Sequence, residues 1–247
     1  MLPRRYFPLS LAGLFSGTAM AAPPAKPIWV SHEIPPYLWQ GANGPQGYAF
    51  HLFQRVVKQA EMGAELHLYP WARALRMLQA GQAEAALVMT RTEERESEFR
   101  WLFPVGRFRF AVFTRQQLGQ APVDLASLKL LRVGALRGSV GRSLLEPAGI
   151  THVVEGKDFV ELLALLDRGI VEAVFGPEPV LRAVVARVGG EVQRIAVTTQ
   201  GYDFYAVAGT AMSTDSIGRL QTAYRQLVDA GVVAQLRRSH PEALLAD

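Results

Sequence analysis

The sequence predicts an α/β protein built of two lobes that two strands connect. Short apolar runs typical of strands alternate with amphipathic helical segments along most of the chain, and this alternation is typical of parallel sheets covered by helices. Two longer segments, residues 108–114 and 202–208, alternate apolar and polar side chains as extended strands do. They flank one complete strand–helix unit, so we expect them to act as a hinge between the lobes.

The composition is that of a globular protein large enough to bury a substantial core. The chain has 247 residues, of which 49% are hydrophobic and 19% are charged. It contains no cysteine, which excludes disulfides and thiolate metal sites, and its five histidines show no metal-binding spacing. The basic residues are scattered without a run of five. We therefore expect no cofactor, no metal and no nucleic-acid partner.

Residues 1–21 have the pattern of a secretory signal peptide. Arg4 and Arg5 provide the positive start, residues 6–15 the apolar segment, and residues 19–21 (Ala-Met-Ala) a small-x-small cleavage site. We expect a mature chain that begins near Ala22 in the periplasm, with a net charge of +2 (24 basic against 22 acidic residues). The paired arginines leave twin-arginine export open, although the general secretory route is the simpler expectation.

The most informative stretch covers residues 69–104. Trp71 and Leu78 fall on one face of an expected short helix, and Gly81 is placed to end it. Residues 85–89 then form an uninterrupted apolar run, typical of a strand buried on both faces. Because open α/β sheets bind ligands at the carboxyl ends of their strands, a binding site is expected directly after this run.

Thr90, Thr92 and Arg95 stand at that edge. Thr92 is a credible N-cap for a helix whose first turn holds Glu93 and Glu94. The planar fork of a guanidinium matches the two oxygens of a carboxylate, and neighbouring hydroxyls add hydrogen bonds. Arg95 and the two threonines therefore indicate a carboxylate-binding site. The residues alone also allow a surface ion pair between Arg95 and an acid of its own helix.

The order of these signals resembles the type II periplasmic solute-binding proteins. The pattern is a helix, Leu-x-x-Gly, acid-Ala, a strand, Met-Thr-x-Thr-x-x-Arg and an aromatic-Pro pair, and it is most similar to family 3, which serves polar amino-acid ABC transporters. The resemblance covers the mature chain, and its specific part is the motif from Thr90 to Arg95. It implies two Rossmann-like lobes, with residues 22–113 and 203–247 in lobe 1 and residues 114–202 in lobe 2. It also implies that Arg95 binds the α-carboxylate of the ligand beside Thr90.

The second lobe offers a further anion-binding position at Gly138 and Ser139. Both residues lie between the expected strand at residues 130–135 and the start of a helix, where backbone amides can bind an anion. The resemblance implies that this pair holds the carboxylate from the second lobe. An ordinary N-cap is the alternative role for Ser139.

The sequence departs from the family pattern after the expected strand at residues 171–175. The resembling proteins have an aspartate there that pairs with the α-ammonium of the ligand, and this chain has Pro177. The next residue, Glu178, is the acid that could replace it. Without an acid an α-amino acid would bury its ammonium unpaired, so the carboxylate end of the site is better supported than the amine end.

Three more candidates follow strands in the first lobe. Tyr37 comes after the expected strand at residues 26–32 and is either a wall against which a ligand lies or an aromatic of the core. Trp71 and Arg73 follow the expected strand at residues 65–69. Arg73 is either a second anion contact or a solvated helix residue.

These observations predict a monomeric periplasmic protein that captures a small carboxylate-bearing solute, such as an amino acid, for an ABC permease in the inner membrane. A sensory receptor that binds its ligand in the same cleft and docks onto a membrane partner is one alternative. The other is an enzyme similar to the periplasmic cyclohexadienyl dehydratases, with Glu172 or Glu178 as the general acid. No Ser-His-Asp set is apparent, and we expect a non-enzymatic protein.

Overall fold

The computed structural model describes residues 26–115 and 125–243, so the expected signal peptide and an expected polar linker at residues 116–122 lie outside the described residues. The strands are β1 (Ile28–Ser31), β2 (Trp39–Gly41), β3 (Gly44–Gln46), β4 (Glu65–Leu68), β5 (Ala85–Thr90), β6 (Arg100–Arg115), β7 (Val133–Leu136), β8 (Val153–Gly156), β9 (Ala173–Pro177) and β10 (Val192–Ala208). The helices are α1 (Tyr48–Gln59), α2 (Trp71–Gln79), α3 (Val140–Leu145), α4 (Phe159–Asp167), α5 (Glu178–Val188), α6 (Thr214–Asp229) and α7 (Val232–Arg238). Short 3₁₀ turns cover Glu93–Arg95, Leu125–Leu130 and Pro241–Ala243.

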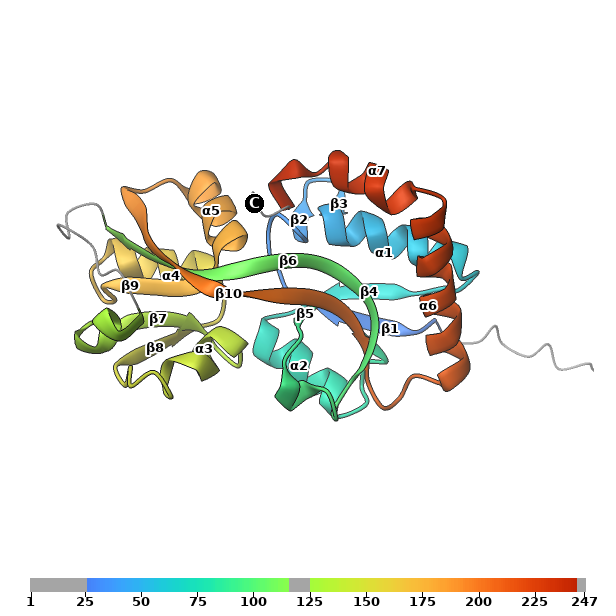
Figure 1. Cartoon of the computed structure of the whole chain (residues 1–247), viewed down its shortest axis with the longest axis horizontal. Coiled ribbons are helices and arrows are strands. Elements are labelled where there is room, and N and C mark those ends of the chain that lie inside the picture. The colour runs from blue at the N-terminus through green and yellow to red at the C-terminus, as the bar shows by residue number, and fades with distance from the viewer. Residues whose placement is uncertain (1–25, 116–124, 244–247) are drawn as a thin grey trace, which may run out of the picture.

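Over the described residues, eight strands join in one mixed sheet in the order β4-β1-β5-β10-β6-β9-β7-β8, and β2 pairs with β3 as a separate hairpin. β1 pairs in parallel with β4 and β5, and β7 pairs in parallel with β8 and β9. The long strands β6 and β10 are antiparallel to each other. Figure 1 shows the two parallel groups at opposite ends of the molecule, with β6 and β10 running between them. The α/β prediction is confirmed.

β6 and β10 connect the two groups. The last residues of β10 pair with β5, whereas residues 110–114 of β6 pair with β9. We propose that both strands pass from a lobe 1 built around β1, β4 and β5 to a lobe 2 built around β7, β8 and β9. The expected boundaries at residues 113 and 203 stay a prediction.

Both long strands are longer than the sequence predicts. β6 begins at Arg100, eight residues before the expected strand at 108–114, and β10 begins at Val192, ten residues before the expected strand at 202–208. Pro104, which lacks an N–H to donate, pairs with Tyr205 where the register between the two strands shifts. Another shift separates Val197 from Gly201. Irregular pairing of this kind accommodates proline and glycine within a strand.

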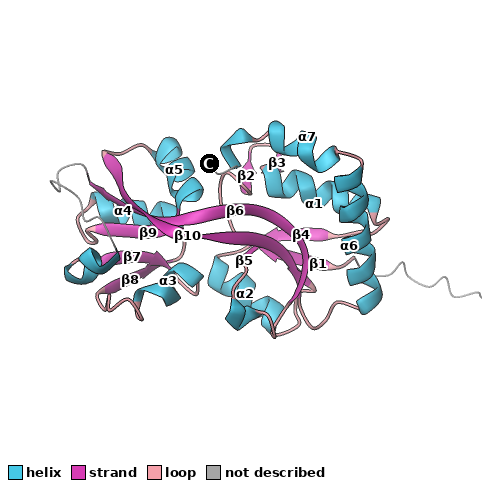
Figure 2. Cartoon of the chain, in the orientation of Figure 1, coloured by secondary structure: helices cyan, strands magenta, loops and turns pink. Residues whose placement is uncertain are grey.

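The helices cover the sheet from both sides. In the view of Figure 2, α1 and α7 lie above the strands of lobe 1 and α2 lies below them. In lobe 2, α5 lies above the strands and α3 lies beside β7 and β8. Helix α1 turns Leu52, Phe53 and Val56 toward the core, as an amphipathic helix on a sheet does. Within the described residues, no helix has the length and apolarity needed to cross a membrane.

Helix α4 begins with a capping pair formed by Asp158 and Glu161. The carboxylate of Asp158 accepts a hydrogen bond from the backbone N–H of Glu161 at 2.7 Å, and the Glu161 carboxylate accepts one from the N–H of Lys157 at 2.7 Å. Asp158→Ala is therefore expected to lower the free energy of unfolding by about 1 kcal/mol, whereas Asp158→Ser, which keeps an acceptor, should lower it less. Urea denaturation measures both. Equal losses would contradict the capping role of this side chain.

Candidate functional site

A small cavity lies between the two lobes at the carboxyl ends of β1, β5, β7 and β9. His32, Trp71 and Thr90 line it from lobe 1, and Ser139 and Pro177 line it from lobe 2. The volume that the centres of water molecules can occupy is about 30 Å³. This is room for roughly two waters. The cavity occupies the sheet edge where the sequence predicts a binding site.

The two lobes touch directly beside this cavity. The indole Nε1 of Trp71, in lobe 1, donates a hydrogen bond to the backbone oxygen of Gly138, in lobe 2, at 2.9 Å. Trp71 is buried, and Gly138 has a φ of 69°, in the left-handed region that favours glycine. Two residues that the sequence singles out are thus brought together, and a solute larger than a few atoms requires this contact to open.

Arg95 lies against the edge of the cavity. Its Nη1 donates to the backbone oxygen of Thr90 at 3.0 Å, and its guanidinium carbon is 5.8 Å from the centre of the Trp71 ring. Burial lowers the pKa of Arg95, and Glu98 and Glu94 oppose that shift, so the side chain stays charged. Among the described residues, however, no carboxylate lies within 4.0 Å of it. The expected alternative, an ion pair with Glu94 or Glu98, is therefore not formed.

Arg95 faces an open groove that adjoins the cavity. The groove has a volume of about 690 Å³ and has Thr92 and Arg95 from lobe 1 and Val140 and Ser143 from lobe 2 in its lining. Among the described residues, five acids also line it: Glu93, Glu94, Glu96, Glu98 and Asp203. Val140 lines the enclosed cavity as well, so the two spaces meet there. Thr92 precedes a single 3₁₀ turn instead of the predicted helix, and its side chain makes no capping hydrogen bond. The polar run after Thr92 has no apolar stripe to hold a longer helix on the core.

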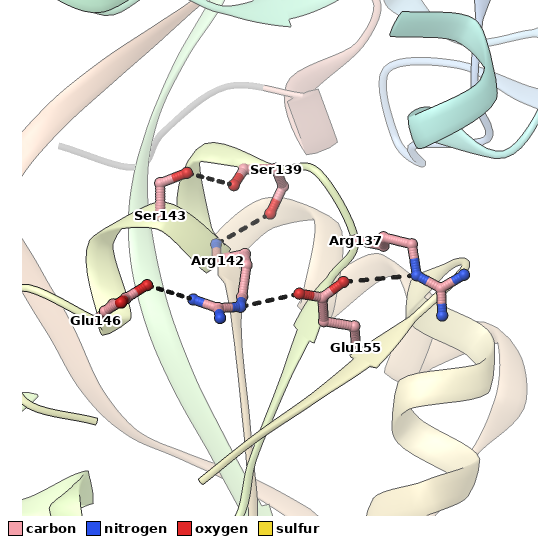
Figure 3. A network of polar contacts seen from close by, with 6 residues as sticks. All are labelled: Arg137, Ser139, Arg142, Ser143, Glu146 and Glu155. Atoms are coloured by element: carbon pink, nitrogen blue, oxygen red, sulfur yellow. Dashed lines mark hydrogen bonds and ion pairs between the residues drawn. The ribbon is translucent and has the colours of Figure 1, made fainter. Parts of the chain in front are cut away.

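Ser139 fills the first of its two predicted roles, the N-cap, while its role in binding a carboxylate stays a prediction. Its Oγ accepts a hydrogen bond from the backbone N–H of Arg142 at 3.2 Å and caps α3, and the same residue lines the cavity. Figure 3 shows that the arginines around it are already paired: Arg142 contacts Glu155 at 3.0 Å and Glu146 at 3.8 Å, and Arg137 contacts Glu155 at 3.5 Å. Arg95 differs from these arginines because it has no such partner among the described residues.

Glu178 does not take the place of the missing acid in this structure. Pro177 lines the cavity, but Glu178 is buried at the start of α5, outside the cavity lining. Its carboxylate forms an ion pair with Arg194 of β10. The prediction that this acid meets a ligand ammonium is corrected for a physical reason: the carboxylate already has a cationic partner and points to it.

Two other candidates lie away from the cavity. Tyr37 is fully buried behind Phe204, with its ring edge-on at a centroid distance of 5.1 Å, and burial raises the pKa of its hydroxyl. It is an aromatic of the core, so the expected ligand wall is corrected. Arg73 is exposed on α2 and stacks over Tyr69 with its guanidinium carbon 4.3 Å from the ring centre, which fits the solvated alternative.

Sequence reasoning missed His32, the first residue after β1. Its side chain lines the cavity, its ring centre is 5.0 Å from that of Trp71, and the residue is only 7% exposed. Neither ring nitrogen has a hydrogen-bond partner among the described residues, and burial lowers the pKa of the imidazole to about 3. Its position directly after a strand, at the carboxyl edge of the sheet, is the signal that could have found it.

The buried His32 makes stability depend on pH. Its pKa is about 3 in the folded protein and 6.5 for an unperturbed histidine, so below pH 6.5 the unfolded state binds more protons and the free energy of unfolding falls as the pH falls. The loss is about 1.4 kcal/mol per pH unit, or about 2 kcal/mol between pH 7 and pH 5. His51, whose pKa is also lowered, adds to the loss in the same direction. Urea unfolding at several pH values should give a shallower dependence for His32→Gln than for the wild type, and equal slopes would contradict the assignment.

Two lobes joined by two strands, with a cavity between them at the strand ends, define a protein that binds a small solute. The chain belongs to the bacterial extracellular solute-binding proteins, family 3, whose sequence profile matches residues 28–243. No curated protein sequence is significantly similar to it.

Several solved structures are similar in fold. A histidine kinase sensor domain similar to periplasmic binding proteins has a TM-score of 0.80 at 17% identity, covering 88% of this chain and 96% of its own. The arginine-, lysine-, histidine-binding protein ArtJ from Geobacillus stearothermophilus has a TM-score of 0.79 at 16% identity, covering 87% and 95%. An ancestral arginine-binding protein bound to arginine has a TM-score of 0.77 at 20% identity, covering 86% and 96%. At these identities the likeness concerns the fold.

Proposed function

We propose that this protein is a periplasmic receptor that binds a small carboxylate-bearing solute between its lobes and delivers it to an ABC permease. Arg95 carries the proposal, because it is a partly buried cation at the edge of the inter-lobe cavity and has no carboxylate within 4.0 Å among the described residues. A desolvated charge without a partner is costly. A ligand carboxylate that pairs with Arg95 offsets a desolvation cost that the folded protein already bears.

The arrangement of the lobes supports a closing mechanism. The cavity holds roughly two waters, so the ligand enters when the contact between Trp71 and Gly138 opens and is enclosed when the lobes return. Arg95 and the Thr90 hydroxyl then approach the carboxylate from lobe 1. Ser139, whose hydroxyl hydrogen is free to donate, approaches it from lobe 2.

A thermal-shift screen tests the proposal directly. The mature protein is heated with monocarboxylates, dicarboxylates, amino acids and simple amines, each at a concentration far above its expected dissociation constant. A ligand at 100 times its dissociation constant adds about 2.7 kcal/mol to the free energy of unfolding, which gives a clear rise in Tm. Shifts confined to compounds with a carboxylate support the proposal. Shifts with amines alone, or with none of the panel, contradict it.

A sensory receptor is the second candidate, because a histidine kinase sensor domain is among the structures similar in fold. The two functions differ in what the loss of the protein does to cells that carry its gene. Lost uptake of the labelled ligand after gene deletion indicates import, whereas unchanged uptake with a lost transcriptional response to the ligand indicates sensing.

We do not propose an enzyme, because both acids that would have to serve as a general acid are engaged. Glu172 is paired with Arg132 at 3.4 Å and Glu178 with Arg194. Turnover of prephenate by the purified protein would overturn this view.

A further inference from the structure

None of the described residues that line the inter-lobe cavity is acidic. Its walls are mostly aliphatic and aromatic, among them Phe110, Phe159 and Phe204, and its polar side chains besides the Trp71 indole are His32, Thr90 and Ser139. An ammonium group enclosed there would lose its water without gaining a carboxylate. The described lining of this cavity therefore offers no carboxylate to a primary amine, whereas the acids near Arg95 line the adjoining groove.

Of these polar side chains, His32 is the one whose polar atoms are all buried without a hydrogen-bond partner among the described residues. Ser139 Oγ already accepts from the N–H of Arg142, whereas both ring nitrogens of His32 are buried without a partner among the described residues. Buried polar groups in folded proteins nearly always have a partner. The Trp71 indole, 5.0 Å away between ring centres, offers His32 only a ring contact because its N–H is committed to Gly138.

We propose that the ligand is a small carboxylic acid that carries a hydroxyl or keto oxygen where an amino acid carries its ammonium, and that His32 is the residue that selects it. This inference rests on the proposed function and names the class of its solute. A neutral imidazole has one N–H donor and one lone-pair acceptor. It can donate to a keto oxygen, and it can donate to or accept from a hydroxyl. Arg95 binds the carboxylate, and the apolar walls contact the body of the acid.

Isothermal titration with matched ligands tests this selection. One series is 3-phenylpropionate, phenyllactate, phenylpyruvate and phenylalanine, and a shorter series is propionate, lactate, pyruvate and alanine. Within each series only the group next to the carboxylate changes. The hydroxy or keto acid is expected to bind about tenfold more tightly than the unsubstituted acid, which is the effect of one additional hydrogen bond in a buried site. The amino acid is expected to bind more weakly than the unsubstituted acid, the hydroxy acid and the keto acid of its series.

Three variants separate selection from a structural role. In His32→Leu the preference for the hydroxy acid over the unsubstituted acid should fall to about onefold, while binding of the unsubstituted acid is retained. His32→Gln, which keeps a donor and an acceptor, should retain most of the preference. His152→Leu removes an exposed histidine of lobe 2 and should leave the preference unchanged.

The outcomes distinguish this inference from the proposed function. Tightest binding by the amino acids, or an unchanged preference in His32→Leu, overturns the inference and leaves a carboxylate receptor in place. Binding by none of the acids overturns both. If His32→Leu fails to fold, the ranking of ligands by the wild type and by His32→Gln still decides the result.

Discussion

Arg95→Ala is expected to weaken binding of the carboxylate ligand by about 2 kcal/mol or more, which is roughly 30-fold in the dissociation constant. The variant removes a charge-assisted pair in a partly buried place and leaves the ligand carboxylate without its cation. The melting temperature of the free protein should change little, because loss of the hydrogen bond to the Thr90 backbone oxygen is offset by removal of a desolvated charge that has no carboxylate partner among the described residues. Titration calorimetry with a ligand from the screen measures the loss.

Two controls sharpen this test. Arg95→Lys keeps the charge but loses the planar fork, so its affinity should lie between those of the wild type and Arg95→Ala. Arg76→Ala removes a positive charge from the exposed face of α2 in the same lobe and should bind as the wild type does. An affinity for Arg95→Ala equal to that of the Arg76 variant would remove the carboxylate model.

Phe204→Ala is expected to destabilise the protein more than the other substitutions considered. Phe204 is buried on β10 and stacks on Phe108 of β6 with ring centres 4.0 Å apart, and Tyr37 packs against its edge. Its backbone also pairs with Thr90 of β5 and with Gly106 of β6. Removing the ring leaves a cavity at the junction of these strands and should cost about 3–5 kcal/mol. For a chain of this size that lowers Tm by about 10 °C.

Phe204→Leu is the matched comparison, since it keeps most of the apolar volume and loses the stacking. Its cost should be less than half that of Phe204→Ala, as measured by urea unfolding of both variants. Similar costs for the two would mean that aromatic stacking, and not filled volume, holds the strands together here.

Local signals predicted the elements of the fold well. The uninterrupted apolar run of β5 and the caps at Asp158 and Ser139 depend on neighbours within a few residues. The lengths of β6 and β10 were not predicted, because Pro104 and Gly201 look like breaks in the sequence. In the sheet each lies at a shift of register between two strands, and that pairing is formed by residues far apart in the chain.

The candidate site likewise contains some residues that local sequence could place and others that it could not. Arg95, Thr90 and Ser139 could be predicted as candidates because each lies at the end of a strand or within a few residues of it, which places them near the ligand edge of the sheet. Tyr37 and Glu178 could not be placed, because what decides their role is contact with Phe204 and Arg194, on a strand that approaches them only in the folded protein. His32 had the right position but belongs to a residue type that is usually structural when single.

The pairing of β6 with β10 bears on how the protein can move. The two strands remain neighbours from Val192 opposite Arg115 to Ala208 opposite Arg100, so the lobes are connected by a double-stranded ribbon and not by two independent linkers. Separating the lobes must bend or twist that ribbon while its ladder of hydrogen bonds persists. We expect this ribbon to resist bending and to bend most easily at its register shifts. We therefore expect the two lobes to move by a limited amount about one preferred arrangement. The stiffness of the ribbon would then set how readily a solute is released.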